Sequence, residues 1–219
     1  MRKASKLVVT IIRPAATCCL SILLALSCPI PAKAAPADAE RFTQIAGFKL
    51  VNLFSFDELA GKFGPSPVIT SGDAATFDAR VCYQTADRTA AVDFFHGEVN
   101  WGFKIHKPRK TDTHCPVSKR LTLEDIAVAG ITLGMGRADY RKLTGKSGGK
   151  AAHYIHHEFR YVHTLTDNEL EALLQRSQSN EPIAGSAESL RQWDVSITLD
   201  ATFKQHHLTS FTVDRAETN

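Results

Sequence analysis

Motifs of two common enzyme classes are each missing from this 219-residue chain by a single residue. A phosphate-binding loop needs a glycine five positions before the string Gly145-Lys146-Ser147, and Tyr140 occupies that position. A metalloprotease helix needs a second histidine four positions after His157, and Tyr161 occupies that position. The sequence therefore predicts neither a nucleotide enzyme nor a zinc protease, and we expect no catalytic residue, cofactor or metal ligand.

Long hydrophobic runs are missing outside the first 34 residues. A basic start precedes a short apolar core, residues 15–28, and Ala32-Lys33-Ala34 offers a small-x-small cleavage site. The apolar core is shorter than the about 20 residues that a membrane-spanning helix needs. We therefore predict a secretory signal peptide over residues 1–34, cleavage after Ala34 and a periplasmic location. Attachment of a lipid to Cys28 is the alternative.

Once this leader is set aside, the chain has no excess of basic charge and few cysteines. Residues 1–34 hold five of the 26 Lys and Arg residues and none of the 23 Asp and Glu residues, which leaves 21 basic and 23 acidic residues. A globally basic nucleic-acid binder is not supported. Three of the five cysteines also lie in the leader. The remaining two, Cys82 and Cys115, predict one disulfide in an exported chain, with two separate buried thiols as the alternative.

Two short segments, residues 55–64 and 136–145, carry the same helix signals. Ser55 begins the first with Glu58 three positions later, which is the spacing of a capping box, and Gly136 begins the second with Asp139 at the same spacing. Each segment ends in a glycine. We therefore predict two short helices, the second over residues 137–144 with Gly145 as its left-handed C-cap. A third helix is predicted over residues 167–178.

Alternating apolar and polar residues predict antiparallel strands after each of the first two helices. The predicted strands are 79–85, 90–96 and 99–105 in the first half, and 153–165, 193–203 and 208–214 in the second. The fold class is therefore α+β. We predict two tandem units of a short helix packed on a small antiparallel β-meander, residues 35–125 with a basic connecting segment and residues 126–219. One continuous sheet formed from both halves is the alternative.

The string Gly130-Ile-Thr-Leu-Gly-Met135, with the capped helix and Gly145 after it, resembles exported bacterial proteins of the SmpA/OmlA type, which are small outer-membrane-assembly lipoproteins. A helix–Gly–sheet unit used twice is also similar to the β-lactamase-inhibitor-protein architecture. The motif covers about 16 residues, and the proline that usually follows the closing glycine is present as Pro65 but absent after Gly145. The resemblance implies a fold and a protein-binding role, and it implies no catalytic residues.

The polar side of the second half is the predicted binding site. In the strand 193–203, Trp193, Val195, Ile197 and Leu199 are expected to face the helices, so Thr198 and Asp200 face away from them. Tyr154, His156 and Arg160 of the strand 153–165 join that side. Tyrosine and arginine are enriched at interface hot spots. The predicted function is a non-enzymatic periplasmic binding protein of the cell envelope, with another envelope protein as its partner.

Two other segments offer alternatives. The histidine-rich strand 153–163 is the expected site if the chain is instead a small periplasmic hydrolase or a metal-dependent enzyme. The basic segment 104–120 is either a solvated connecting loop or a weak contact with anionic surfaces through Lys104, Lys107, Arg109 and Lys110. It lacks interleaved aromatic residues, so we expect no binding to single-stranded nucleic acid.

Overall fold

The computed structural model describes residues 36–50, 54–72, 78–145, 153–179 and 189–218, all of which belong to one unit, Lys33–Asn219. The predicted leader, its cleavage site after Ala34 and the alternative lipid site at Cys28 lie outside the described residues. Within them, no helix has the length and apolar character needed to cross a membrane.

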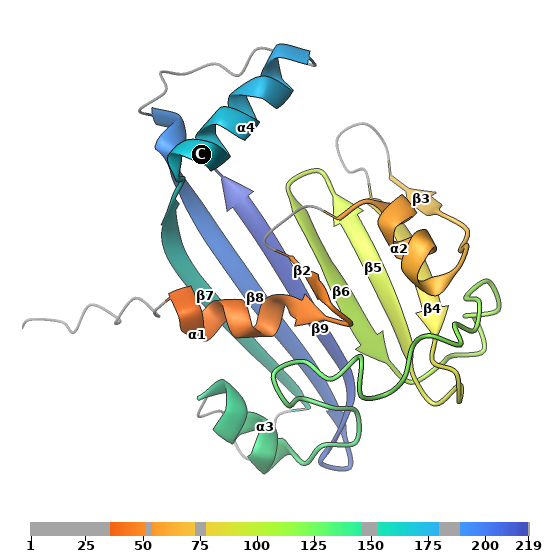
Figure 1. Cartoon of the computed structure of the whole chain (residues 1–219). Coiled ribbons are helices and arrows are strands. Elements are labelled where there is room, and N and C mark those ends of the chain that lie inside the picture. The colour runs from red at the N-terminus through yellow and green to blue at the C-terminus, as the bar shows by residue number, and fades with distance from the viewer. Residues whose placement is uncertain (1–35, 51–53, 73–77, 146–152, 180–188, 219) are drawn as a thin grey trace, which may run out of the picture. The chain divides into compact units, whose positions relative to one another are not determined.

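The described residues form short helices and one large sheet (Figure 1). The helices are α1 (Pro36–Glu40), α2 (Phe56–Phe63), α3 (Arg137–Thr144) and α4 (Asp167–Ser179), with 3-10 turns η1 (Arg41–Thr43) and η2 (Ser189–Arg191). The strands are β1 (Gln44–Ile45), β2 (Phe48–Lys49), β3 (Ile69–Ser71), β4 (Asp78–Gln84), β5 (Ala91–Gly97), β6 (Asn100–His106), β7 (Tyr154–Thr164), β8 (Gln192–Lys204) and β9 (His207–Thr218). Strands β1 and β2 pair with each other, and the other seven form an antiparallel sheet in the order β3-β4-β5-β6-β9-β8-β7.

The predicted α+β class is confirmed, whereas the two tandem units are not. Strand β6 from the first half pairs with β9 from the second, and Phe103 lies opposite Val213. Strands of both halves therefore belong to one sheet, which is the alternative that the sequence left open. The junction at β6 and β9 carries seven facing residue pairs.

Local signals placed the three predicted helices, α2, α3 and α4, correctly, whereas α1 was not predicted. The Ser55 hydroxyl accepts a hydrogen bond from the Glu58 N–H at 3.1 Å, and the Ser55 N–H donates to the Glu58 carboxylate at 2.9 Å, so the predicted capping box begins α2. Helix α3 ends at Gly145, whose φ of 69° is the left-handed conformation that glycine adopts without a steric penalty. Thr166 and Glu169 form the same capping box before α4.

Helices α2 and α3 cover the same side of the sheet. Phe63 of α2 lies 5.4 Å from the ring of Tyr83 and 6.1 Å from the ring of Phe94. Tyr140 of α3 lies 5.5 Å from the ring of Phe203. Each of these aromatic side chains is buried. A fully buried Phe stabilises the folded state by about 1.5–3 kcal/mol relative to an exposed one. We call this side of the sheet the helical side.

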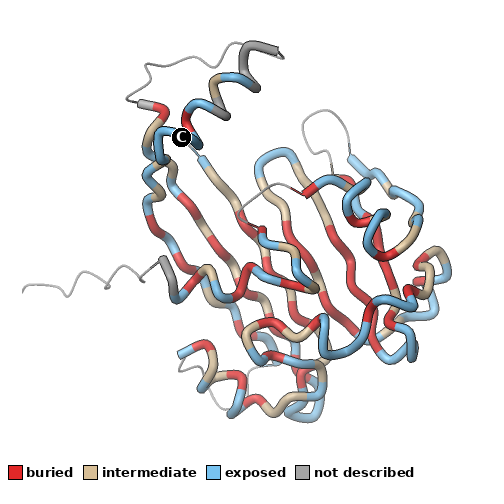
Figure 2. The backbone as a smooth tube through the Cα atoms, viewed as in Figure 1, coloured by how far each residue is buried: buried red, intermediate tan, exposed pale blue. Residues whose placement is uncertain are grey.

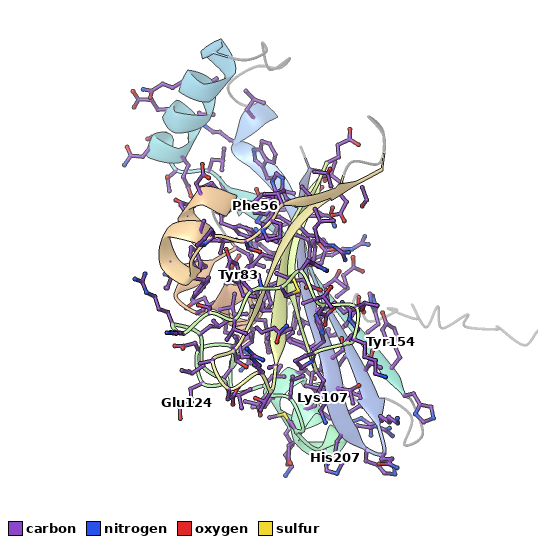
Figure 3. All side chains as sticks on the ribbon, turned by 90° about the vertical axis from the view of Figure 1, so that its right-hand side faces the viewer. Phe56, Tyr83, Lys107, Glu124, Tyr154 and His207 are labelled. Atoms are coloured by element: carbon purple, nitrogen blue, oxygen red, sulfur yellow. A yellow bond between two sulfur atoms is a disulfide. The ribbon has the colours of Figure 1, made fainter. Side chains whose placement is uncertain are left out.

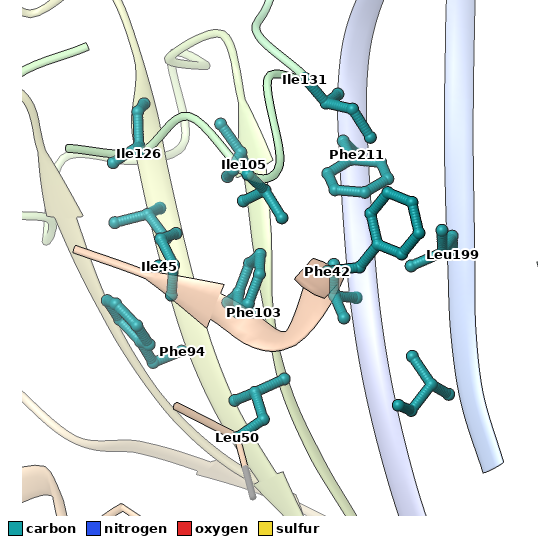
Figure 4. Close-up of a cluster of buried hydrophobic side chains, with 14 of the residues drawn as sticks. Phe42, Ile45, Leu50, Phe94, Phe103, Ile105, Ile126, Ile131, Leu199 and Phe211 are labelled. Carbon is teal, nitrogen blue, oxygen red and sulfur yellow. The ribbon is translucent and has the colours of Figure 1, made fainter. Parts of the chain in front are cut away.

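The N-terminal segment, residues 36–50, also covers the helical side. Phe42, Ile45 and Leu50 are buried there and pack with Phe103 and other residues of the sheet in one hydrophobic core (Figure 4). Figure 2 shows the buried residues alternating with half-buried and exposed ones along the long strands, as a sheet with one covered side requires.

A buried ion-pair network fixes this N-terminal segment to the sheet. Arg215 of β9 is 1% exposed and lies on the helical side. Its guanidinium contacts Glu40 at the end of α1 at 2.6 Å and Glu217 at 2.6 Å, and it donates to the Tyr161 hydroxyl at 3.2 Å. Burial by itself would raise the pKa of Glu40, but the hydrogen bonds from Tyr161 and Arg215 and the positive charge of Arg215 hold it below its usual range. Helix α1 is therefore held to the sheet as well as packed on it.

Candidate functional site

The side of β7, β8 and β9 opposite the helices is polar and open to solvent; we call it the polar face. Its residues include Tyr154, His156, Glu158 and Arg160 of β7, Asp194, Ser196, Thr198, Asp200, Thr202 and Lys204 of β8, and Thr212, Asp214 and Ala216 of β9. Figure 3 views the sheet on edge, with Phe56 of α2 on the helical side and Tyr154 on the other. All five residues predicted for the binding site therefore share one face.

Three of the five predicted site residues contact one another. The Tyr154 hydroxyl donates to the Asp200 carboxylate, and His156 Nδ1 lies 2.9 Å from the same carboxylate oxygen. The hydrogen bond to Asp200, together with burial and the charge of Asp200, raises the pKa of Tyr154 to about 12. Tyr154 is 53% exposed. The structure thus presents a neutral aromatic side chain to solvent and fixes its hydroxyl end.

Arg160 takes part in a second group, next to a shallow hollow. Its Nε donates to Glu158 at 2.8 Å, and Ser196 donates to the same carboxylate at 3.0 Å. The hollow has a volume of about 390 Å³, and its lining includes Glu158, Arg160, Asp194, Ser196, Ala216 and Thr218. The guanidinium and the two carboxylates give it polar groups of both charges.

Thr198 lies between the two groups, because Ser196 and Asp200 are its neighbours on the same side of β8. In the sheet register it is flanked by Glu158 of β7 and Asp214 of β9. Asp214 accepts a hydrogen bond from Asn100 at 2.9 Å through one carboxylate oxygen. The other oxygen is buried and has no hydrogen-bond partner among the described residues. Burial and the nearby charge of Asp200 raise the pKa of Asp214, against the effect of the Asn100 bond. The polar face therefore presents three carboxylates to solvent, from Glu158, Asp194 and Asp200, and a less exposed one from Asp214. Its cations are Arg160 and, at the end of β8, Lys204.

The histidines of the predicted histidine-rich strand do not gather at one place. His157 faces the helical side and stacks on Phe159 at 4.1 Å, while His156 faces the polar side. His163 lies 3.4 Å from Glu169 of α4. Within the described ranges, the one group of three metal-ligating side chains is that of Cys82, His114 and Cys115.

The predicted disulfide between Cys82 and Cys115 is present, with an S–S distance of 2.01 Å. It ties the basic segment to β4. Because both sulfurs are bonded to each other, neither offers a thiolate to a metal ion in this state. The disulfide therefore acts as a covalent tie for residues 107–120 of that segment, which form no helix and belong to none of the named strands.

A charge cluster that sequence analysis missed joins the same basic segment to β5; its His106, Asp93 and Asp112 side chains are buried and its Arg109 side chain is half exposed. His106 Nε2 is 3.1 Å from Asp93, and its Nδ1 is 3.8 Å from Asp112. Arg109 contacts Asp112 at 3.1 Å and Asp93 at 3.8 Å. Burial opposes ionisation of Asp112, but the hydrogen bonds and charge of Arg109 hold its pKa below the usual range. These residues come from different turns and strands, so no sequence period indicates the cluster.

This cluster changes the prediction for the basic segment. Arg109, one of the four residues predicted to contact anionic surfaces, is engaged with Asp93 and Asp112. Lys104 is half-buried, and Lys107 and Lys110 are exposed. Two of the four cations are therefore fully available at the surface, which weakens the case for an anionic contact there.

An apolar hollow of about 380 Å³ lies on the helical side. Its lining consists of Ile105, Leu123, Glu124, Ile126, Ala127, Ile131, Thr132, Leu133, Leu208 and Phe211. Figure 4 shows four of these residues, Ile105, Ile126, Ile131 and Phe211, grouped at the edge of the core. Leu123 at its rim is 41% exposed. Residues 131–133 belong to the string that carries the family resemblance, which therefore forms part of this hollow.

One string with the letters of a hydrolase nucleophile motif, Gly145-Lys146-Ser147-Gly148-Gly149, follows α3. A nucleophile elbow joins a strand to a helix, whereas Gly145 ends a helix. Residues 146–149 lie outside the described residues. The letters alone therefore do not indicate a hydrolase.

Comparison with known proteins gives no relative of this chain. No family model, no curated protein and no solved structure matches it. The resemblance of residues 130–145 to SmpA/OmlA-type proteins therefore stays a prediction, and the function must be argued from the polar face itself.

Proposed function

We propose that this chain is an exported, non-enzymatic binding protein of the cell envelope, and that the polar face is its working surface. The observation that carries the proposal is the asymmetry of β7–β9. Val195, Ile197 and Leu199 are buried on the helical side, whereas the polar side of the same strands presents Tyr154 and Arg160 to solvent. Exposed tyrosine and arginine beside hydroxyl groups form the kind of surface that binds proteins.

The charge of the polar face indicates which partner would fit. Three solvent-facing carboxylates, those of Glu158, Asp194 and Asp200, outnumber the two cations, Arg160 and Lys204. Glu158 and Asp200 lie next to Thr198. Complementary charge speeds association and selects partners. We therefore propose a partner that presents basic side chains, namely another envelope protein, with binding that weakens as salt increases.

The alternative of a small hydrolase or a metal-dependent enzyme on the strand 153–163 has less support. That strand divides its histidines between two sides of the sheet, and a catalytic or metal site would need them to converge.

A substitution at the centre of the polar face tests the proposal. Thr198→Lys places a cation between Glu158 and Asp214, so it should preserve or raise the thermal midpoint while it blocks a basic partner. Gln44→Lys is the matched control, because Gln44 is exposed on β1 of the N-terminal segment and the change in charge is the same. In capture from a periplasmic extract, we expect Thr198→Lys to bind the partner about tenfold or more weakly and Gln44→Lys to bind normally.

Equal capture by both variants would reject the polar face. If Lys107→Ala with Lys110→Ala abolishes capture while Thr198→Lys does not, the basic segment is the binding surface.

A further inference from the structure

Strand β7 is a long edge of the seven-stranded sheet (Figure 1). It pairs with β8 over eleven consecutive residues, from Tyr154 to Thr164, without a shift in register. Backbone groups on the outer side of an edge strand are free to pair with another strand. Either some feature of β7 therefore prevents such pairing, or another strand pairs with β7.

Two backbone hydrogen bonds show which residues of β7 face outward. The Phe203 N–H donates to the His153 carbonyl at 2.7 Å, and the Leu165 N–H donates to the Arg191 carbonyl at 2.8 Å. Because every second residue of an antiparallel strand bonds to the same neighbour, the odd-numbered residues bond toward β8. The even-numbered residues from Tyr154 to Thr164 direct their N–H and C=O groups away from the sheet. In the part of the chain that the structure describes, none of these groups has a backbone partner.

The two edges of the sheet differ in how they are protected. Strand β3, at the other edge, has three residues and follows Pro65 and Pro67. Short edge strands and prolines are devices that prevent pairing with other chains, as are edge lysines and bulges. Strand β7 has eleven residues, no proline and no lysine, and its register with β8 shows no bulge. Its outer side is therefore suited to pairing.

We propose that β7 pairs antiparallel with β7 of a second copy of this chain, about a twofold axis at Phe159. Residues 154–164 are centred on Phe159, so this register overlaps the whole strand. The even-numbered residues then face one another in six pairs, each able to exchange two hydrogen bonds, which gives about twelve backbone hydrogen bonds. Any other register leaves residues at both ends without a partner.

The side chains favour the same register. Glu158 faces the partner's Arg160, and Arg160 faces the partner's Glu158. Since Glu158 and Arg160 already pair at 2.8 Å within one protomer, the dimer sets four alternating charges side by side. An axis one residue away, at Glu158 or at Arg160, would place like charges directly opposite each other, which is destabilising. Charge complementarity and overlap thus select one register, and they select a second copy as the occupant.

Pairing in this way would extend the antiparallel sheet across the twofold axis. The polar faces of the two protomers would then lie on the same side, because antiparallel neighbours keep equivalent faces together. The dimer goes beyond the proposed function and does not depend on it, since it is argued from the edge of the sheet alone.

The test measures the mass of the purified full chain in solution across a range of concentrations by sedimentation velocity. The wild-type chain should reach twice the protomer mass. Arg160→Glu and Glu158→Arg each place like charges opposite each other twice in the dimer, so each should raise the dimer dissociation constant about tenfold or more. The double variant Glu158→Arg/Arg160→Glu restores complementary pairs and should restore the dimer.

A backbone substitution tests the edge without any change of charge. Val162→Pro removes an N–H that points outward and leaves the hydrogen bonds to β8 in place, so it should weaken the dimer while the circular dichroism spectrum stays unchanged. Val162→Thr keeps the N–H and is its control. A wild-type chain that stays monomeric at every concentration, or a dimer that is insensitive to Val162→Pro, would overturn the proposal. A dimer that tolerates each single charge reversal, or one that the double variant does not restore, would overturn the register.

Discussion

Removal of the Glu40 carboxylate should destabilise the whole fold, although Glu40 lies in a short helix near the N-terminal end of the described residues. Its side chain is 26% exposed. It accepts hydrogen bonds from Arg215 at 2.6 Å, from Thr43 at 2.9 Å and from the Tyr161 hydroxyl. In Glu40→Ala, the Arg215 guanidinium stays 1% exposed and loses one of its two carboxylate partners.

The size of the destabilisation depends on the ion pair that Arg215 keeps in the variant, which is the one with Glu217. Breaking a fully buried ion pair costs about 3–5 kcal/mol. Glu217 still pairs with Arg215, and Glu40 is partly solvated, so we expect a loss of about 2–3 kcal/mol in the free energy of unfolding. Urea denaturation at neutral pH measures this loss. Glu171→Ala, an exposed change on α4, is the control and should lie within about 0.5 kcal/mol of wild type.

The loss of stability caused by Glu40→Ala should become smaller at acidic pH. The pKa of Glu40 is lowered in the folded protein, so its stabilising effect is complete above the pKa of the unfolded chain and is lost as pH falls through the lower folded value. The difference between wild type and Glu40→Ala should therefore be constant from neutral pH down to about pH 5 and shrink below that. A difference under about 0.5 kcal/mol at neutral pH would refute the role of Glu40.

Two further predictions concern the sheet. Cys82→Ser should lower the free energy of unfolding by about 2–4 kcal/mol through loss of the link to Cys115, measured by the same denaturation; native protein with two thiols open to alkylation would contradict the disulfide. Asp214→Asn should raise the thermal midpoint at neutral pH, because the raised pKa of Asp214 means that its ionised form is disfavoured in the fold. That gain should vanish as pH falls below the pKa of the unfolded carboxyl group, and an unchanged or lower midpoint at neutral pH would count against the buried, unpaired oxygen.

Local patterns in the sequence predicted most of the elements. The capping box at Ser55, the closing Gly145 and the alternation through residues 193–203 each depend on neighbours a few positions apart, and each was confirmed. The composition of the polar face followed from the same alternation. Its five predicted residues share one side because period two fixes the side on which each residue lies.

Long-range arrangements could not be predicted in this way. The pairing of β6 with β9 joins residues more than a hundred positions apart, and neither strand carries a local signal for its neighbour. Arg215 shows a second reason why the sequence did not predict these arrangements. It follows Phe211 and Val213 on the buried side of β9, but a charged residue there breaks the apolar pattern, so the predicted strand ended at Asp214. Its partner Glu40 is 175 residues away.

The most direct test of the polar face is photo-cross-linking in cells that produce the chain. A photoreactive amino acid is placed at Thr198 on the polar face, at Gln44 on the N-terminal segment or at Lys110 in the basic segment. The proposed function predicts one discrete cross-linked protein from position 198, formed less efficiently as salt increases, and none from position 44. A cross-link from position 110 or 44 with none from position 198 would contradict it.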